Sequence, residues 1–139
     1  DLGLGAGFYL NATQEPWSTH YHMETFVVDE LPTVLAGIEG LDLDRLSICG
    51  HSMGGHGAIS LALKYPGRYQ SASAFSPICA PTSCPWGKKA FSAYLGTDET
   101  LWKQHDSCEL IRGGAPQIPL LVDQGAADPF LEEQLQPSG

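Results

Sequence analysis

Residues 46–57 read LSICGHSMGGHG, and this stretch decides the fold. An apolar run leads into the pattern G-x-S-x-G at positions 50–54, with Ser52 at its centre. A short apolar run that ends in a glycine is typical of a buried parallel strand. The segment after it is rich in small apolar residues, which favours a helix covered on most sides. Strand, serine and helix in this order predict a nucleophile elbow, a tight turn that raises the serine hydroxyl above the sheet.

The glycines around Ser52 have a steric explanation in such an elbow. A side chain at Gly50 or Gly54 would collide with the neighbouring strand or helix, and Gly55 and Gly57 are expected to extend the same close packing. The pattern alone also arises by chance and then marks only a turn, so the alternative is that Ser52 is a turn residue. The match between motif and predicted context favours the nucleophile.

An elbow of this kind also supplies electrostatic stabilisation. The helix that starts after Ser52 has free backbone N–H groups and a positive dipole end, so the N–H of Met53 is the predicted oxyanion donor. A second donor usually comes from a loop after an earlier strand, and no such segment except the glycine-rich start precedes the elbow here. We therefore expect the second donor in a missing N-terminal part. This chemistry needs neither a metal nor an organic cofactor.

A serine nucleophile needs a base and an orienting carboxylate, which in this architecture follow it in the order acid, then histidine. Asp128 is the predicted acid because it lies on a turn after a strand, whereas its competitor Asp123 ends that strand. None of the five histidines follows Asp128. His51 and His56 flank the elbow too closely to reach round to Ser52, and we expect packing or hydrogen-bonding roles for them. His105 is interpreted as a surface residue.

The rest of the chain alternates helical and strand-like segments, which predicts a parallel sheet with crossover helices. A helix is expected over residues 19–38, with an irregularity at Pro32 because proline lacks the backbone donor. Residues 78–117 form a long excursion of the kind that usually lies over a site. The other predicted elements are strands at 45–50, 69–77 and 118–125, a helix after the elbow, a helix from 128, and helical patches at 88–95 and 100–110. We expect a single α/β domain over residues 1–139, with the elbow at 50–54 and the acid loop at 123–130.

Composition restricts the partners and the compartment. A net charge of -9 argues against nucleic acid and anionic membranes, because neither would be attracted to this surface. No apolar stretch approaches the roughly 18 residues that suggest a membrane span. The four cysteines lack C-x-x-C spacing, which argues against zinc and favours reduced thiols in a soluble, cytoplasmic protein. The expected partner is a small-molecule substrate, with a homodimer left open.

The two ends of the sequence predict a piece of a longer protein. The chain starts at Asp1 rather than methionine, and it stops at QLQPSG shortly after a helix-like stretch begins. Truncation before the catalytic histidine also accounts for the lack of a histidine after Asp128. We therefore expect a partial fold without its first strands and its histidine segment, and an isolated chain that is inactive.

Three longer stretches resemble the S-formylglutathione hydrolase family, also known as the esterase D family: GHSMGGHGA, SPICAPTSCPWGKKAFSAYLGTD and DQGAADPFL. GAGFYLNATQEPW and YHMETFVVDELP upstream resemble it too, so the similarity spans nearly the whole chain. The resemblance implies an α/β-hydrolase fold and hydrolysis of S-formylglutathione to glutathione and formate, with side activity on simple esters. By position, Ser52 matches the family's nucleophile, Asp128 its acid and Met53 its oxyanion donor.

The excursion offers candidate binding residues. Trp86, Phe91 and Tyr94 are candidates for lining a tight acyl pocket, and Lys88 with Lys89 for meeting the glutathione carboxylates. The alternative is that the aromatic residues anchor the excursion in the core and that the lysines are merely solvated. The rival functions are a carboxylesterase or acyltransferase of the same fold, and a pseudohydrolase or interaction module without catalysis.

Overall fold

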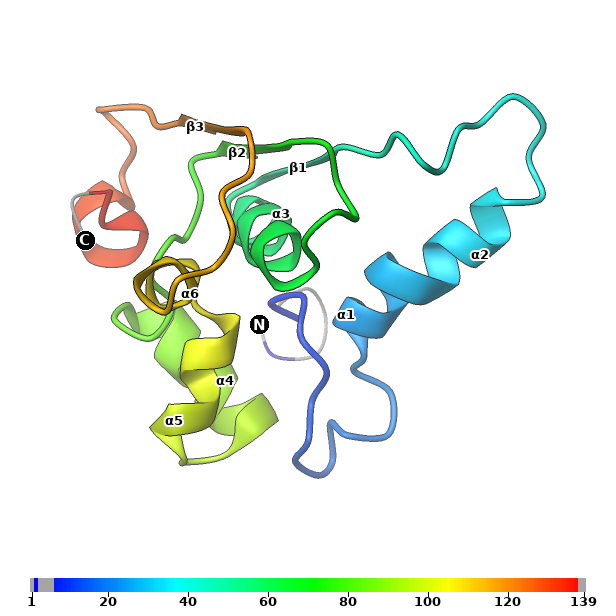
Figure 1. The fold of residues 1–139 in the computed structure, drawn as a ribbon. Helices are drawn as coiled ribbons and strands as arrows, with labels where there is room; N and C mark the ends of the chain where they lie inside the picture. The colour runs from blue at the N-terminus through cyan, green and yellow to red at the C-terminus, as the bar shows by residue number, and fades with distance from the viewer. Residues whose placement is uncertain (1, 3–6, 138–139) are drawn as a thin grey trace.

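A parallel three-stranded sheet forms the centre of the protein in a computed structural model that describes Leu2 and residues 7–137 (Figure 1). The strand order is β1, β2, β3, and both pairings are parallel, as predicted. His51 pairs with Phe75, and Phe75 pairs with Asp123, so the three strands end at one level. The loops that follow them therefore leave the same edge of the sheet. The strands are β1 (Ile48–His51), β2 (Ala72–Phe75) and β3 (Leu120–Asp123).

Helix α3 (Met53–Lys64) follows β1 and packs along one face of the sheet (Figure 1). Nine consecutive residues, from 55 to 63, are buried. Glycine or alanine at four of these positions lets the helix lie close to both β1 and β2. The helix predicted to be covered on most sides is thus confirmed. Its burial against the sheet holds the first turn of α3 directly after Ser52.

The helix before the sheet is shorter than predicted and contains a π-helical turn. It consists of α1 (Met23–Thr25), η1 (Phe26–Glu30) and α2 (Leu31–Leu35). Pro32 has no N–H to donate to the carbonyl four residues earlier, which is that of Val28. That carbonyl instead accepts a hydrogen bond of 2.6 Å from Nη2 of Arg68. The irregularity expected at Pro32 therefore takes the form of a widened turn just before it.

The excursion after β2 contains three short helices and a 3-10 turn. They are α4 (Pro85–Leu95), α5 (Glu99–Trp102), η2 (Lys103–His105) and α6 (Ser107–Arg112). The single helical patch predicted at 100–110 is wrong, because Asp106 breaks it. Oδ1 of Asp106 caps α6 by accepting the N–H of Glu109 at 3.0 Å, and Oδ2 accepts both the N–H and the hydroxyl of Thr82. This fully buried carboxylate ties the start of the excursion, at Thr82, to α6 near its end.

The largest core cluster lies between the N-terminal segment, α4 and the π-helical turn η3 (Leu131–Leu135). In this cluster, residues near both ends of the described chain pack against the excursion. T-shaped ring contacts join Trp17 to Tyr94 and Phe8 to Phe91. Its buried members are Phe8, Leu10, Ala12, Ile78, Cys84, Ala90, Phe91, Tyr94, Leu95, Trp102 and Leu135.

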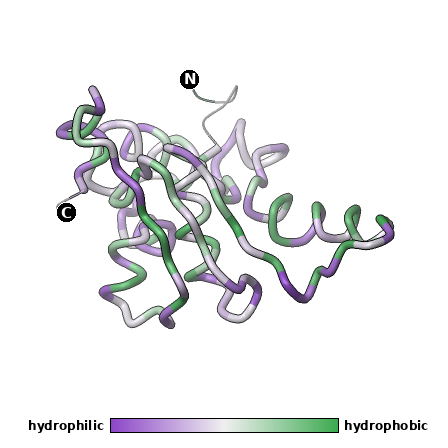
Figure 2. The backbone as a smooth tube through the Cα atoms, turned by 90° about the horizontal axis from the view of Figure 1, so that it is seen from above, coloured by the Kyte–Doolittle hydropathy of each residue, from purple (hydrophilic) through white to green (hydrophobic). Residues whose placement is uncertain are grey.

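The sheet face opposite α3 is open in the described part of the chain and carries both apolar and polar residues. Leu121 in β3 is 54% exposed, and Figure 2 shows hydrophobic stretches along the strands as seen from above. No helix among the described residues lies over this face (Figure 1). None of the described helices is long and apolar enough to cross a membrane.

Candidate active site

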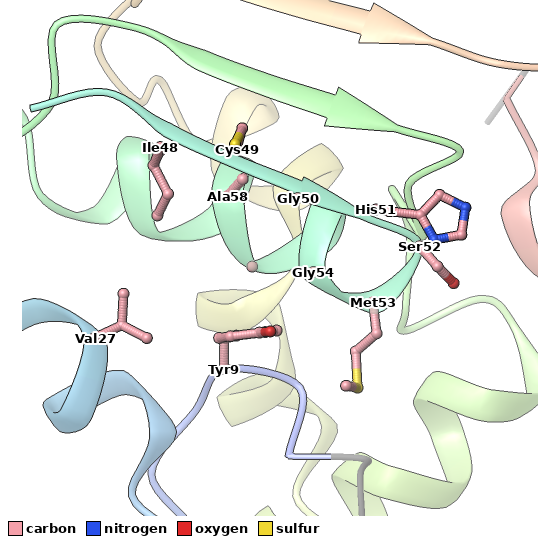
Figure 3. Close-up of a pocket in the computed structure, with 11 residues that line it drawn as sticks. Tyr9, Val27, Ile48, Cys49, Gly50, His51, Ser52, Met53, Gly54 and Ala58 are labelled. Carbon is pink, nitrogen blue, oxygen red and sulfur yellow. The ribbon is translucent and has the colours of Figure 1, made fainter. Parts of the chain in front are cut away.

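Ser52 occupies a strained turn between β1 and α3 (Figure 3). Its φ of 56° and ψ of -117° are values that L-residues other than glycine rarely adopt. The turn is held by three backbone hydrogen bonds of Ser52: its N–H donates to Phe75, and its carbonyl accepts from His56 and Ile78. The hydroxyl does not cap the helix, so it is left for other chemistry. Strand, strained serine and helix together form the predicted elbow geometry.

The glycines confirm most of the steric prediction. A Cβ on Gly50 would lie 2.1 Å from the carbonyl oxygen of Gly54, and one on Gly57 would lie 2.4 Å from the ring of Tyr9. A Cβ on Gly55 would meet Pro77 at 2.9 Å. The prediction for Gly54 is wrong, because a Cβ there would have the hydroxyl of Tyr9 as its nearest neighbour at 3.6 Å, an ordinary contact. Gly50 is therefore the glycine on which the turn depends.

Met53 is the first residue of α3, so its N–H has no acceptor within the helix. A pocket of about 510 Å³ opens beside it, with walls from β1, the first two turns of α3, Tyr9 and Val27 (Figure 3). Ser52 and Met53 both line this pocket. Positions 3–6 of the glycine-rich start, which precedes the elbow in this chain, lie outside the described residues.

Asp128 lies half-buried on the loop after β3, which leaves the same sheet edge as Ser52. Its Oδ1 accepts the N–H of Phe130 at 2.9 Å, and its own N–H donates to Gly125 at 3.2 Å. Asp123 is exposed at the end of β3, where its carbonyl accepts the N–H of Ser76 at 2.7 Å. The backbone of Asp123 thus extends the sheet, while the Asp128 carboxylate orders a turn beyond it.

The histidines near the elbow differ from one another. His56 is fully buried between the rings of Phe8 and Phe91, and its Nε2 bonds the Phe8 carbonyl at 3.2 Å, so the expected packing role is confirmed. Burial lowers the pKa of His56 to about 4, which keeps the ring neutral. His51 is exposed at the end of β1, which contradicts a packing role for it.

The surface role expected for His105 is wrong, because its side chain belongs to a largely buried polar cluster with Glu24, Lys64 and Tyr65. Nζ of Lys64 and the hydroxyl of Tyr65 each lie 2.6 Å from the Glu24 carboxylate. Nδ1 of His105 lies 3.3 Å from Nζ of Lys64. The pKa of His105 falls to about 4, mainly through burial and then through repulsion by Lys64, so its neutral ring accepts from the ammonium.

This cluster joins α1, the end of α3 and η2, which are distant in sequence. Sequence reasoning missed it because the i,i+3 and i,i+4 spacings that reveal charge pairs operate only within one helix. The one available signal was Glu24, a charged residue on the apolar face predicted for its helix. No group of three or more histidine, cysteine, aspartate or glutamate side chains among the described residues is arranged to hold a metal ion.

The five candidate binding residues fall into two classes. Trp86 is 38% exposed, and Lys88 and Lys89 are exposed too. Phe91 and Tyr94 are fully buried in the core, which supports the alternative that they anchor the excursion. The ring of Trp86 contacts that of Phe130 in the acid loop in a tilted arrangement, with centroids 4.8 Å apart. The excursion and the acid loop are thus in direct contact.

Comparison with known proteins agrees with this geometry. The family model described as Putative esterase matches residues 1–139. The chain belongs to this esterase family. S-formylglutathione hydrolases of Rattus norvegicus and Mus musculus are each 53% identical to it over 139 residues, which is 99% of this chain and 49% of each relative. The solved structure of an S-formylglutathione hydrolase from Agrobacterium tumefaciens has a TM-score of 0.93 and 52% identity, over 96% of this chain and 48% of that one.

These similarities confirm the α/β-hydrolase fold predicted for this esterase-family chain, with its small parallel sheet flanked by helices. They also confirm the resemblance to S-formylglutathione hydrolases that the sequence motifs indicate. The chain spans about half the length of the curated relatives it matches.

Proposed function

We propose that the protein of which this chain is part hydrolyses the thioester S-formylglutathione to glutathione and formate. The strained elbow at Ser52 carries the proposal, because a serine in that conformation at the end of a buried strand is a costly arrangement for a mere turn. The 53% identity to proteins named S-formylglutathione hydrolase supports this substrate over others. Ser52 is the proposed nucleophile and Asp128 the proposed triad acid.

The proposed reaction has two steps. Oγ of Ser52 attacks the formyl carbon, and its proton passes to a histidine in the half of the protein that this chain does not span. The oxyanion accepts the N–H of Met53, and collapse of the intermediate breaks the C–S bond. Glutathione leaves as a thiolate, which is a good leaving group because the pKa of a thiol is about 8.5. Water then attacks the formyl ester on Ser52, formate leaves, and the serine regains its proton.

Among the candidate binding residues, Trp86 and Lys88 remain in the proposal. Their exposure on α4 gives a substrate access to them. Lys88 supplies positive charge for a substrate that carries two carboxylates, on a chain whose net charge is -9. We leave Phe91 and Tyr94 out as direct contacts because neither is exposed.

We also propose a cytoplasmic location. All four cysteines lie in the described residues and are unpaired, and burial raises the pKa of the Cys79 thiol to about 11. Unpaired thiols fit a reducing compartment. A homodimer remains a proposal that light scattering on the purified gene product tests.

The deciding experiment compares substrates on the full-length gene product. We expect kcat/KM for S-formylglutathione to exceed that for a generic aryl ester and for thioesters with longer acyl chains. Faster turnover of the longer acyl esters would favour a carboxylesterase or acyltransferase. A full-length product that turns over none of them would favour a pseudohydrolase.

A further inference from the structure

We propose that Gln134 is a positioning residue for Asp128, and that it acts by fixing the segment after the acid to the N-terminal end of α4. The proposal rests on the proposed function, in which Asp128 is the triad acid. The contact between the excursion and the acid loop plays no part in the reaction scheme above. Under this proposal it holds the triad acid in position.

The first observation is a long-range hydrogen bond. Oε1 of Gln134 accepts the backbone N–H of Trp86 at 3.0 Å, across 48 positions of sequence. Trp86 is the second residue of α4, where a helix has no internal acceptor for the N–H. The Sγ atom of the N-cap residue Cys84 accepts the next N–H, that of Gly87, at 3.4 Å. Gln134 is 4% exposed, so water does not readily replace it as the acceptor.

A second contact joins the same two segments. The ring of Phe130 lies against that of Trp86, with centroids 4.8 Å apart and the planes inclined by 52°. Leu135, next to Gln134, is buried in the core cluster that includes α4 residues. The segment after the acid is therefore held on α4 by a hydrogen bond, an aromatic contact and an apolar anchor.

A short chain of hydrogen bonds leads from Gln134 to the acid. The N–H of Gln134 donates to the carbonyl of Phe130 at 3.0 Å. The N–H of Phe130 donates to Oδ1 of Asp128 at 2.9 Å, which fixes the direction of that carboxylate. Anchoring Gln134 on α4 thus determines where Phe130 sits, and Phe130 orients the Asp128 side chain.

This orientation matters because of what a triad acid does. The carboxylate holds the imidazole in the productive tautomer and stabilises the imidazolium that forms when the serine loses its proton. A displaced carboxylate also lowers the pKa of the histidine, because a nearby negative charge is what raises it. Misplacement by about 1 Å can reduce a rate by about 100-fold.

The test uses full-length Gln134→Leu, which removes the acceptor, and Gln134→Glu, which keeps an oxygen facing the Trp86 N–H. We expect Gln134→Leu to lower kcat/KM by about 10- to 100-fold, with little change in KM. The acidic limb of its pH profile should move to lower pH, and Gln134→Glu should recover most of the rate. Val28→Ala, a buried position far from α4 and the acid loop, is the control for lost stability, and it should lower the thermal midpoint without moving the pH profile.

Two outcomes would overturn the inference. One is a Gln134→Leu enzyme whose rate and pH profile match those of Val28→Ala, because Gln134 would then act on stability alone. The other is an equal loss in Gln134→Leu and Gln134→Glu, which would exclude the acceptor role. Failure of the proposed function looks different: the unmodified protein itself would neither hydrolyse S-formylglutathione nor react with a fluorophosphonate, and the positioning role would fall with it.

Discussion

The backbone N–H of Ser52 donates to the carbonyl oxygen of Phe75 at 2.8 Å, so the hydrogen bonding between β1 and β2 continues into the elbow. The serine therefore takes its unusual dihedral angles while one end of the turn is still part of the sheet. Gly50 allows this, because the turn folds back until the Gly54 carbonyl occupies the space a Gly50 side chain would need. The sheet and the first turn of α3 together enforce the strain at Ser52.

Replacing Gly50 by alanine should destabilise the protein strongly, whereas replacing Gly54 by alanine should have little effect on its stability. Gly50→Ala forces a Cβ to within 2.1 Å of a backbone oxygen and is expected to cost more than about 4 kcal/mol of unfolding free energy or to prevent folding. Gly54→Ala meets only an ordinary contact and gains helix propensity, so it should change stability by less than about 1 kcal/mol. Urea unfolding of both variants measures the difference. Similar stabilities would mean that the elbow is not as tightly closed as described.

Asp128→Asn should abolish most of the activity, whereas Asp123→Asn should not. The first change leaves the acid loop in place but removes the charge that orients the base, a loss of about 10⁴-fold in kcat for a triad of this type. Asp123 contributes its backbone to the sheet edge and has an exposed side chain, so its variant should stay within a few-fold of the original rate. Steady-state kinetics on the full-length gene product measure both. The reverse ranking would assign the triad acid to Asp123.

The buried Asp106 should be the strongest single link within the excursion, because it joins Thr82 near its start to α6. Asp106→Ala leaves the two Thr82 donors and the Glu109 N–H without their acceptor, at an expected cost of about 2 to 4 kcal/mol. Asp98→Ala is the matched control, because Asp98 caps α5 in the same way but is exposed, and it should cost about 1 kcal/mol or less. Urea unfolding and limited proteolysis of residues 78–117 follow the effect. Equal costs at the two caps would show that burial adds nothing at Asp106.

Stability should fall as the pH drops from about 6.5 to about 4. The folded pKa of His105 and that of His56 are both about 4, below the value of about 6.5 in an unfolded chain, so unfolding takes up protons in this interval. Their contribution is complete above pH 6.5 and is lost as the pH falls through 4. Each histidine adds a slope of up to about 1.4 kcal/mol per pH unit.

His105→Gln isolates one of the two contributions. Near pH 5 it should flatten the dependence of unfolding free energy on pH by up to about 1.4 kcal/mol per pH unit, as measured by urea unfolding at several pH values. Gln104→Ala, an exposed neighbour of His105 whose side chain does not titrate, is the control and should leave the slope unchanged. An unaltered slope in His105→Gln would mean that the His105 ring is protonated in the folded protein.

Sequence reasoning succeeded where the controlling interactions are local. The order of strand, Ser52 and small-residue helix depends on neighbours within a few positions, and so does the turn after β3 that carries Asp128. It failed where a distant partner decides: the break at Asp106 depends on Thr82, and the burial of His105 depends on Glu24, about 80 positions away. The error at Gly54 arose because a motif records which residues are small but not which of them faces backbone and which faces a side chain.

The central claim is that Ser52 is the nucleophile, and the most direct test is to treat the full-length gene product with a fluorophosphonate and locate the adduct by mass spectrometry. We predict a single adduct on Ser52, which is lost in Ser52→Ala and retained in the control Ser47→Ala at the far end of the sheet. No adduct, or an adduct on another serine that persists in Ser52→Ala, would contradict the account.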